Sequence, residues 1–280
     1  MTYVFTLRAA TTDTSLLKLE RDLAIYDGAT EFLYDLGKEY SWASQAAPAN
    51  GAAVNDLTHA DKHGSVVTSS TGPTFAGEGF DFAGVTAGAS HMVKTPTSVL
   101  TAIQAATNQY WAAIHYYKLP ASGDWPAGQA NIAAFSGNSA IPSPGLFMLT
   151  MHVNGANKIM VAYFGRSGGA FTNLETAIGA ITPFLGTVTQ VMVWRDATGI
   201  HMRLKNATDE YTITAAVGSK NTDAFGAKYA SFGVVDSLRP TGNARNFRFF
   251  RAFLENLDVS GRSATAVADA DWTRNGARFS

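Results

Sequence analysis

Apolar and polar residues alternate with a period of two along most of this chain. Alternation of this kind places successive side chains on opposite faces of a strand and predicts half-buried β-structure. Eight runs rich in β-branched and aromatic residues have strand length, namely Tyr110–Tyr117, Leu146–Val153, Ile159–Phe164, Val188–Trp194, Ile200–Leu204, Tyr211–Thr214, Ser231–Val235 and Phe247–Leu254. A further run, Tyr3–Arg8, alternates in the same way near the N-terminus.

Short clusters of turn-forming residues separate these runs. They are Asn154-Gly155, Gly168-Gly169, Asp196–Gly199 and Asn206–Glu210. Glycine and asparagine favour the backbone conformations that tight hairpins need. Successive strands joined by short turns pair antiparallel, and two stacked layers bury one face of each sheet. The pattern therefore predicts an all-β, antiparallel two-sheet sandwich.

Helical periodicity is confined to the two ends of the chain. Between Ser15 and Tyr26, leucines fall at helical spacing, but others share the parity of a strand, and both interpretations stay open. Near the C-terminus, Ser263 is placed to cap a helix over Ala264–Arg274 that stops at Gly276.

Glycine and proline interrupt the apolar pattern between residues 28 and 51 and suggest a boundary there. We assign residues 1–35 to an N-terminal arm, 36–262 to the sandwich and 263–280 to a short C-terminal helical tail. An arm that leaves the sandwich has apolar side chains with nothing to cover them. We expect these to anchor the chain in a homo-oligomer through Tyr3, Phe5, Leu7, Leu16, Leu19 and Leu23.

The local sequence predicts the environment of several side chains. Phe80 and Phe82 are expected to enter the core together. Asp56 is expected to accept local backbone hydrogen bonds. In the last strand Phe247, Phe249 and Phe253 are expected on one face, with Arg251 among them. An inward arginine needs a carboxylate partner or a bulge that turns it out, and the bulge is favoured.

Composition narrows the function classes. With 21 Lys+Arg, 22 Asp+Glu and a net charge of −1, the chain has no cationic field suited to nucleic acid. It contains no cysteine, which excludes disulfides and thiolate metal sites. No apolar stretch approaches the roughly 20 residues of a membrane span. The first residues lack the features of a secretory signal, so we expect the chain to mature in the cytoplasm of the cell that produces it.

The order of several short motifs resembles concanavalin-A-like, laminin-G-like jelly-roll domains. The motifs are Asp56-Leu57-Thr58, His63-Gly64, Gly79–Gly84, His91–Pro96 and the aromatic pair Tyr110-Trp111. The ending Arg251–Arg262 is similar to the closing strand and turn of such domains in tailed-bacteriophage virion proteins. The resemblance covers about three quarters of the chain and implies a jelly-roll sandwich exposed on a virion. Because virion appendages usually assemble around symmetry axes, the resemblance also favours a trimer as the homo-oligomer.

Glycoside hydrolysis, the reaction of some enzymes with the resembled fold, requires particular carboxyl groups. Retaining glycosidases place two carboxyl groups about 5–5.5 Å apart, and hydrolases of the resembled fold carry Glu-x-Asp-x-Glu on a strand. No glutamate here starts that pattern, and Glu78 with Asp81 has the wrong parity. His59, Asp61 and His63 form a polar loop rather than a known metal motif. We expect no catalytic residue, metal or cofactor.

Glycan binding has better candidates. Sugars are held by aromatic stacking and planar polar side chains on loops. Trp125 lies in a turn beside Asp124, and Asn138, Arg166 and Asn173 lie in other glycine-rich loops that can converge on it. The alternative, that Trp125 folds back over a sheet edge, is slightly favoured.

Three functions remain after this weighing. The first is a non-enzymatic phage structural protein, a capsid or tail decoration, fibre or adhesin, located on the virion. It contacts other virion proteins and, as an option, a host-surface polysaccharide. The second is a non-viral carbohydrate-binding module. The third, a glycoside hydrolase of the same fold, is disfavoured by the missing acid pair.

Overall fold

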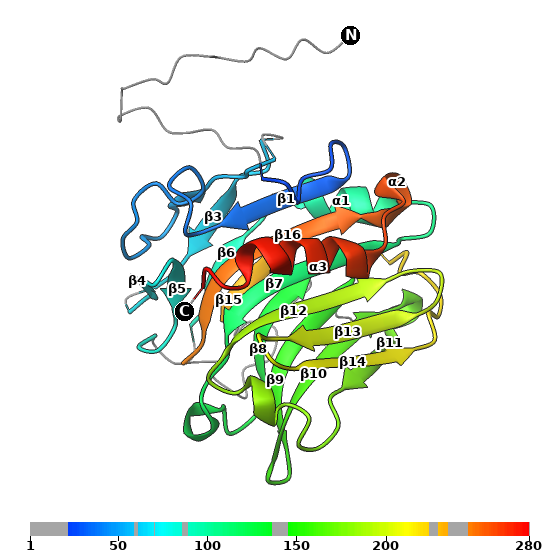
Figure 1. The fold of residues 1–280 in the computed structure, drawn as a ribbon. Coiled ribbons are helices and arrows are strands. Elements are labelled where there is room, and N and C mark those ends of the chain that lie inside the picture. The colour runs from blue at the N-terminus through cyan, green and yellow to red at the C-terminus, as the bar shows by residue number, and fades with distance from the viewer. Residues whose placement is uncertain are drawn as a thin grey trace.

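Two antiparallel β-sheets of eight strands each pack face to face (Figure 1). The computed structural model describes residues 22–58, 61–69, 71–85, 89–135, 145–223, 229–234 and 246–279. Within these residues the sandwich predicted from the period-two pattern is confirmed.

The first sheet combines short strands from the N-terminal third of the chain with longer strands from its middle and its end. In spatial order it runs β14 (Glu210–Ala215), β13 (Ile200–Lys205), β12 (Val188–Arg195), β7 (Trp111–Lys118), β16 (Arg248–Asn256), β5 (Gly79–Asp81) and β4 (Thr74–Ala76). The eighth strand, β1 (Thr30–Asp35), pairs with the later part of β16.

The second sheet faces the first across the core. Its order is β11 (Phe171–Glu175), β10 (Asn157–Gly165), β9 (Phe147–Asn154), β8 (Ala130–Phe135), β15 (Ala230–Val234), β6 (His91–Lys94), β3 (Gly64–Val67) and β2 (Ala53–Val54). Short 3-10 turns interrupt the connections at Ser122–Asp124, Ser167–Gly169 and Thr182–Phe184.

All eight strand-length runs that the alternation predicted are strands of these sheets. They correspond to β7, β9, β10 and β12 to β16, each within two residues of the expected ends. The predicted turns also join their strands: Asn154 pairs with Asn157 across the β9–β10 hairpin. The run Tyr3–Arg8 lies outside the described residues.

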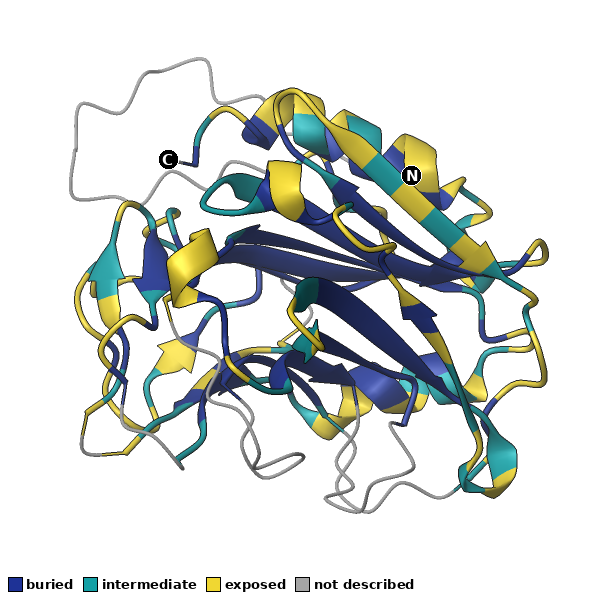
Figure 2. Cartoon of the chain, turned by 90° about the horizontal axis from the view of Figure 1, so that it is seen from below, coloured by how far each residue is buried: buried dark blue, intermediate teal, exposed yellow. Residues whose placement is uncertain are grey.

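Aromatic side chains fill the space between the sheets. Trp111 of the first sheet stacks on Phe147 of the second at 5.0 Å, and Phe249 stacks on Phe232 at 5.3 Å between ring centroids. Phe80 and Phe82 are buried in this same cluster, as predicted. Figure 2 shows the buried residues along the strands and the exposed residues at the loops and helices. The core between the sheets is therefore rich in packed aromatic rings.

A β-bulge in the last strand, β16, reverses the alternation of inward-facing and outward-facing side chains. The register of β16 against β7 shifts between Phe249 and Arg251. The extra residue leaves Phe249 in the inter-sheet core, while Phe250 and Phe253 point to the outer face of the first sheet. The expectation that Phe253 shares a face with Phe249 is therefore wrong, because the bulge reverses the alternation.

The outer face of the first sheet is covered by the C-terminal helix. Helix α3 (Ala264–Asn275) lies across β7 and β12 (Figure 1), and Trp272 stacks on Tyr116 at 5.9 Å. The Ser263 hydroxyl accepts a hydrogen bond from the Ala266 amide, which confirms the predicted cap. Burial on both faces explains the nearly continuous apolar runs of β7 and β16.

A buried arginine holds this helix against the sheet. The Arg251 guanidinium is fully buried and donates hydrogen bonds to Asp22, Asp35 and Asp271, each at 2.8 Å from its nearest nitrogen. Sequence analysis gave a bulge or a carboxylate partner as alternatives. The structure has both, since the bulge turns Arg251 away from the inter-sheet core and three carboxylates receive it on the other side.

Three other features differ from the sequence-based expectations. Residues Thr30–Asp35, assigned to the arm, form β1 within the first sheet, so the sandwich begins before the expected boundary. Helix α1 (Thr97–Ala105) was not anticipated, and a short helix, α2 (Leu257–Ser260), follows β16. Residues 22–26, the described part of the ambiguous Ser15–Tyr26 segment, form turns rather than a helix or strand.

No helix among the described residues is long and apolar enough to cross a membrane.

Candidate functional site

Trp125, the central residue of the expected glycan site, is buried. Only 7% of it is exposed, and its Nε1 donates a hydrogen bond of 3.0 Å to the carbonyl of His152. Its ring belongs to the inter-sheet core. The structure therefore shows the alternative in which Trp125 folds back over the sheet, and no open ring face is left for a sugar.

The other predicted glycan residues do not gather around Trp125. His152, its partner, pairs with Ile159 on β10, whereas Arg166 follows the far end of that strand. Seven residues of extended chain separate these points by roughly 23 Å. Asn173 is exposed on β11 and donates to Glu175, and Asp124 is exposed near Trp125. Asn138 lies outside the described residues.

The residues expected to anchor an oligomer lie mostly beyond the described part of the chain. This holds for Tyr3, Phe5, Leu7, Leu16 and Leu19. Leu23 is described, and 71% of it is exposed. Oligomerisation through the arm stays a prediction.

A hollow lies on the outer face of the first sheet, between the N-terminal end of α3 and the β12–β13 turn. Its volume is about 600 Å³, which is within the usual range for sites that hold small ligands. We call it the Trp194 groove, and it is lined by Tyr110, Trp194, Asp196, Ala197, Thr198, His201, Leu257, Gly261, Arg262, Ser263, Ala264 and Thr265.

The β12–β13 turn forms one wall of the Trp194 groove because Asp196 organises it. Asp196 Oδ1 accepts hydrogen bonds from the amides of Thr198 at 2.7 Å and Gly199 at 3.2 Å. Gly199 is required here, since a Cβ at this position would lie 2.6 Å from the Ala215 carbonyl oxygen. The sequence Asp196–Gly199 therefore specifies a tight, rigid turn.

An aromatic pair forms the floor. Trp194 and His201 are cross-strand neighbours, and their rings stack with centroids 4.3 Å apart and planes 10° from parallel. Trp194 Nε1 donates to Asp196 Oδ2 at 2.9 Å. The two nitrogens of His201 lie 2.9 Å from Thr214 Oγ1 and 3.2 Å from Asp196 Oδ1. These contacts fix both rings before any ligand arrives.

Asp196 stays ionised in this setting. Burial raises the pKa of Asp196, but hydrogen bonds from Thr198 and Trp194 and the nearby His201 outweigh it, so the pKa lies below the usual value. Asp196 thus presents hydrogen-bond acceptors to the groove rather than a proton.

The opposite wall comes from the connection between α2 and α3. Arg262 is held by Glu255, with a 2.8 Å hydrogen bond from its Nε, and its guanidinium lies 5.0 Å from the Tyr26 ring centroid. The Tyr110 amide donates to Asp258 at 3.2 Å, which sets the position of Tyr110. This wall is therefore fixed by Glu255 and Asp258, which lie outside the groove.

The Trp194 groove is lined by side chains of several chemical kinds. Its lining combines aromatic rings with hydroxyl, carboxylate and guanidinium groups, and Asp196 is the single carboxylate among the lining residues. Glycoside hydrolysis by the usual mechanisms uses two carboxyl groups.

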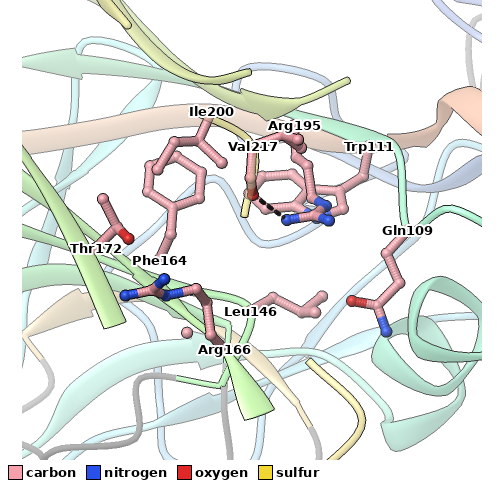
Figure 3. A pocket seen from close by; sticks show the side chains of 10 residues that line it. Gln109, Trp111, Leu146, Phe164, Arg166, Thr172, Arg195, Ile200 and Val217 are labelled. Atoms are coloured by element: carbon pink, nitrogen blue, oxygen red, sulfur yellow. Dashed lines mark hydrogen bonds between the residues drawn. The ribbon is translucent and has the colours of Figure 1, made fainter. Parts of the chain in front are cut away.

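A second, much smaller cavity lies between the sheets at the end of the sandwich where β10 and β12 finish (Figure 3). Arg195 from the first sheet and Arg166 from the second stand on opposite sides of it (Figure 3). Arg166 was predicted as a ligand-binding residue, whereas Arg195 carried no sequence signal. No group of three or more histidine, aspartate or glutamate residues suited to a metal ion occurs in the described ranges.

Sequence reasoning missed the Trp194 groove for a physical reason. Asp196–Gly199 was identified only as a turn. The groove exists because the first turn of α3 lies opposite that turn on the outer face. A tryptophan two residues before an Asp-x-x-Gly turn was the available signal, but it does not show which face of the sheet the ring occupies.

Comparisons with known proteins give distant structural likenesses. No family model matches the chain, and no curated protein matches it. A sialidase of Trypanosoma rangeli in complex with sialic acid is 13% identical with a TM-score of 0.46, over 82% of this chain and 32% of that one. The binding domain of botulinum neurotoxin serotype D/C is 11% identical with a TM-score of 0.48, over 86% and 52%.

An alginate lyase from Klebsiella pneumoniae is 10% identical with a TM-score of 0.41, over 75% of this chain and 92% of that one. The chain thus spans about a third of the sialidase and about half of the toxin domain. Likeness at this level assigns no activity, and the function is argued below from the geometry of the Trp194 groove.

Proposed function

We propose that this protein is a non-enzymatic structural component of a phage virion that displays the sandwich and binds a host-surface glycan in the Trp194 groove. The observation that carries the binding proposal is the groove itself. The half-buried ring of Tyr110 and a rim of polar groups line a hollow of about 600 Å³, large enough for one or two sugar rings.

The groove offers the two kinds of contact that sugars need. Sugar rings present apolar C–H faces that pack on aromatic side chains, and the half-buried Tyr110 supplies such a surface above the buried Trp194–His201 pair. Sugar hydroxyls need hydrogen-bond partners, which Thr198 and Arg262 provide around the rim. Because the rings are already held in place, binding costs little side-chain ordering.

The single lining carboxylate supports binding without hydrolysis. Asp196 is occupied by donors from its own turn and has a lowered pKa, so it is a poor general acid. We expect no release of reducing ends when the protein is incubated with a glycan that it retains. A measurable release of reducing ends would contradict the non-enzymatic assignment.

The virion setting depends on the similarity of the closing segment, Arg251–Arg262, to phage virion domains. This segment supplies the last strand, the Arg251 cluster and one wall of the groove. The order of neighbouring genes tests it, and we expect capsid and tail genes on either side. Flanking genes for polysaccharide metabolism would favour the non-viral carbohydrate-binding module.

Blocking the groove tests the binding proposal. Thr265 is exposed on the first turn of α3 and lines the groove, so Thr265→Trp fills the hollow without disturbing the core. Thr273 is exposed on the same helix but does not line the groove, which makes Thr273→Trp a matched control. The probe is an array of host-envelope polysaccharides and oligosaccharides.

We expect Thr265→Trp and Tyr110→Ala to weaken retention of the bound glycan at least tenfold, and Thr273→Trp to bind as the wild type does. Equal binding by wild type and Thr265→Trp would remove the groove from the proposal. Failure of the wild-type protein to retain any glycan on the array would overturn the binding function.

A further inference from the structure

Arg195 differs from the other buried arginines of the described chain. Arg203 is paired with Asp269 at 2.9 Å, and Arg251 is surrounded by three carboxylates. Arg195 is only 8% exposed, yet no described carboxylate forms an ion pair with it. Burying a cation without an opposite charge is costly, so this exception points to a missing partner.

The contacts of Arg195 are made with neutral groups. Nη1 donates to the carbonyls of Val217 at 2.7 Å and Ser219 at 3.4 Å, and Nη2 donates to the Gly218 carbonyl at 3.1 Å. Its Nε is buried and has no hydrogen-bond partner within the described residues. Burial lowers the pKa of Arg195, against weaker opposing effects of Tyr110 and Asp258. The charge is therefore incompletely compensated.

A second cation lines the same cavity. Arg166 follows β10 and is half-buried, and its Nη2 makes one long hydrogen bond of 3.3 Å to the Phe171 carbonyl. Its Nε is also buried and unpaired within the described part of the protein. The remaining lining residues are Gln109, Trp111, Leu146, Phe164, Gly165, Thr172, Ile200 and Val217, none of them acidic (Figure 3).

The size of the cavity restricts what can occupy it. The space open to the centre of a water-sized sphere is about 10 Å³, which corresponds to about one small occupant. A carboxylate or phosphate is too large for this space. A water molecule fits and accepts hydrogen bonds from the arginines, but it leaves two positive charges uncompensated at the end of the sandwich.

We propose that this cavity binds a single halide-sized anion, chloride under physiological conditions, between Arg166 and Arg195. The ion accepts hydrogen bonds from the unpaired Nε groups and offsets the two guanidinium charges. Because Arg195 belongs to the first sheet and Arg166 to the second, a bound anion joins the two layers where β10 and β12 end. The inference is independent of glycan binding, since the Trp194 groove lies on the outer face.

Anion-dependent stability tests the site. The melting temperature Tm is measured in 150 mM sodium chloride and in 150 mM sodium gluconate, which supplies the same ionic strength with an anion too large for the cavity. An anion present at about tenfold above its Kd raises Tm by roughly 2–4 °C in a protein of this size. We expect this rise for the wild-type protein.

Two arginine variants separate a specific site from general screening. Arg166→Met removes one side of the cavity and loses only one long hydrogen bond, so the variant is expected to fold and to show no difference between the two salts. Arg248→Met, which removes the partner of Asp81 at 2.8 Å, is the matched control and keeps the difference. Equal Tm values for the wild-type protein in both salts would refute the proposal, as would an unchanged chloride effect in Arg166→Met.

A crystal grown or soaked in sodium bromide gives a direct readout. We expect an anomalous bromide peak within hydrogen-bond distance of Arg195 Nε in the wild-type protein and no such peak in Arg166→Met. Ordinary water density without an anomalous signal at this position would show that the occupant is neutral and would overturn the inference.

Discussion

His115 lies in the middle of the inter-sheet core without a polar partner. It is fully buried, both of its ring nitrogens lack hydrogen-bond partners among the described residues, and Phe135, Phe147 and Phe232 surround it. Burial lowers the pKa of His115 from 6.5 to about 3. The side chain is therefore neutral near pH 7 and packs as an aromatic ring. The effect of its titration on the free energy of unfolding appears only in acid.

The sign of the pH effect follows from the lowered pKa. Below pH 6.5 the unfolded chain binds a proton at His115 that the folded protein excludes until about pH 3. The contribution is therefore fully favourable above pH 6.5 and is lost as the pH falls. We expect His115→Phe to gain stability relative to wild type by about 1.4 kcal/mol per pH unit between pH 6 and 4.

Urea unfolding of the two proteins at several pH values measures this difference. A wild-type and His115→Phe pair whose free energies of unfolding stay parallel from pH 7 to pH 4 would show that His115 can be protonated in the folded protein. At pH 7 itself the comparison reports packing and the desolvation of the two unpaired ring nitrogens, because both proteins are then neutral at this position.

Helix α3 determines the position of the Trp194 groove. Its cap, Ser263, and its first turn line the hollow, and further along the helix Asp269 and Asp271 pair with cations of the sheet. The sequence predicted this helix and its cap from local signals alone. It did not predict that the helix lies across β7 and β12, because that depends on contacts between residues far apart in the chain.

The cap of α3 can be tested by removing one hydroxyl. Ser263→Ala deletes the acceptor for the Ala266 amide, and we expect the free energy of unfolding to fall by about 1 kcal/mol. Thr273→Ala, an exposed change on the same helix, is expected to stay within about 0.5 kcal/mol of wild type. Equal effects of the two changes in chemical denaturation would show that Ser263 does not act as a cap.

On the scale of the whole molecule, the Arg251 cluster joins the beginning and the end of the described chain. Asp22 precedes β1, Asp35 ends β1 and Asp271 lies on α3, and all three meet the same guanidinium. Arg278 adds a second cation to Asp35. The cluster therefore fixes both the N-terminal strand and the C-terminal helix on the outer face.

Removing the central charge of this cluster leaves buried carboxylates without their main partner. We expect Arg251→Met to lower the free energy of unfolding by about 3–5 kcal/mol. Arg248→Met, which breaks a partly exposed pair with Asp81, is expected to cost about 1 kcal/mol or less. Denaturant titrations of both variants provide the comparison, and a cost for Arg251→Met no larger than that for Arg248→Met would contradict this role.

The sequence by itself determined eight of the sixteen described strands, the turns between them, the sandwich and the capped C-terminal helix, because alternation, turn chemistry and capping are local properties. Only the tertiary structure decided that Trp125 is buried, that the bulge sends Phe253 and Arg251 outward, and that Trp194 and His201 meet α3 around a groove. The first outcomes depend on which face of the sheet each side chain points to. The Arg251 cluster depends on charges that lie more than two hundred residues apart in the sequence, such as Asp22 and Arg251. No local pattern encodes such contacts.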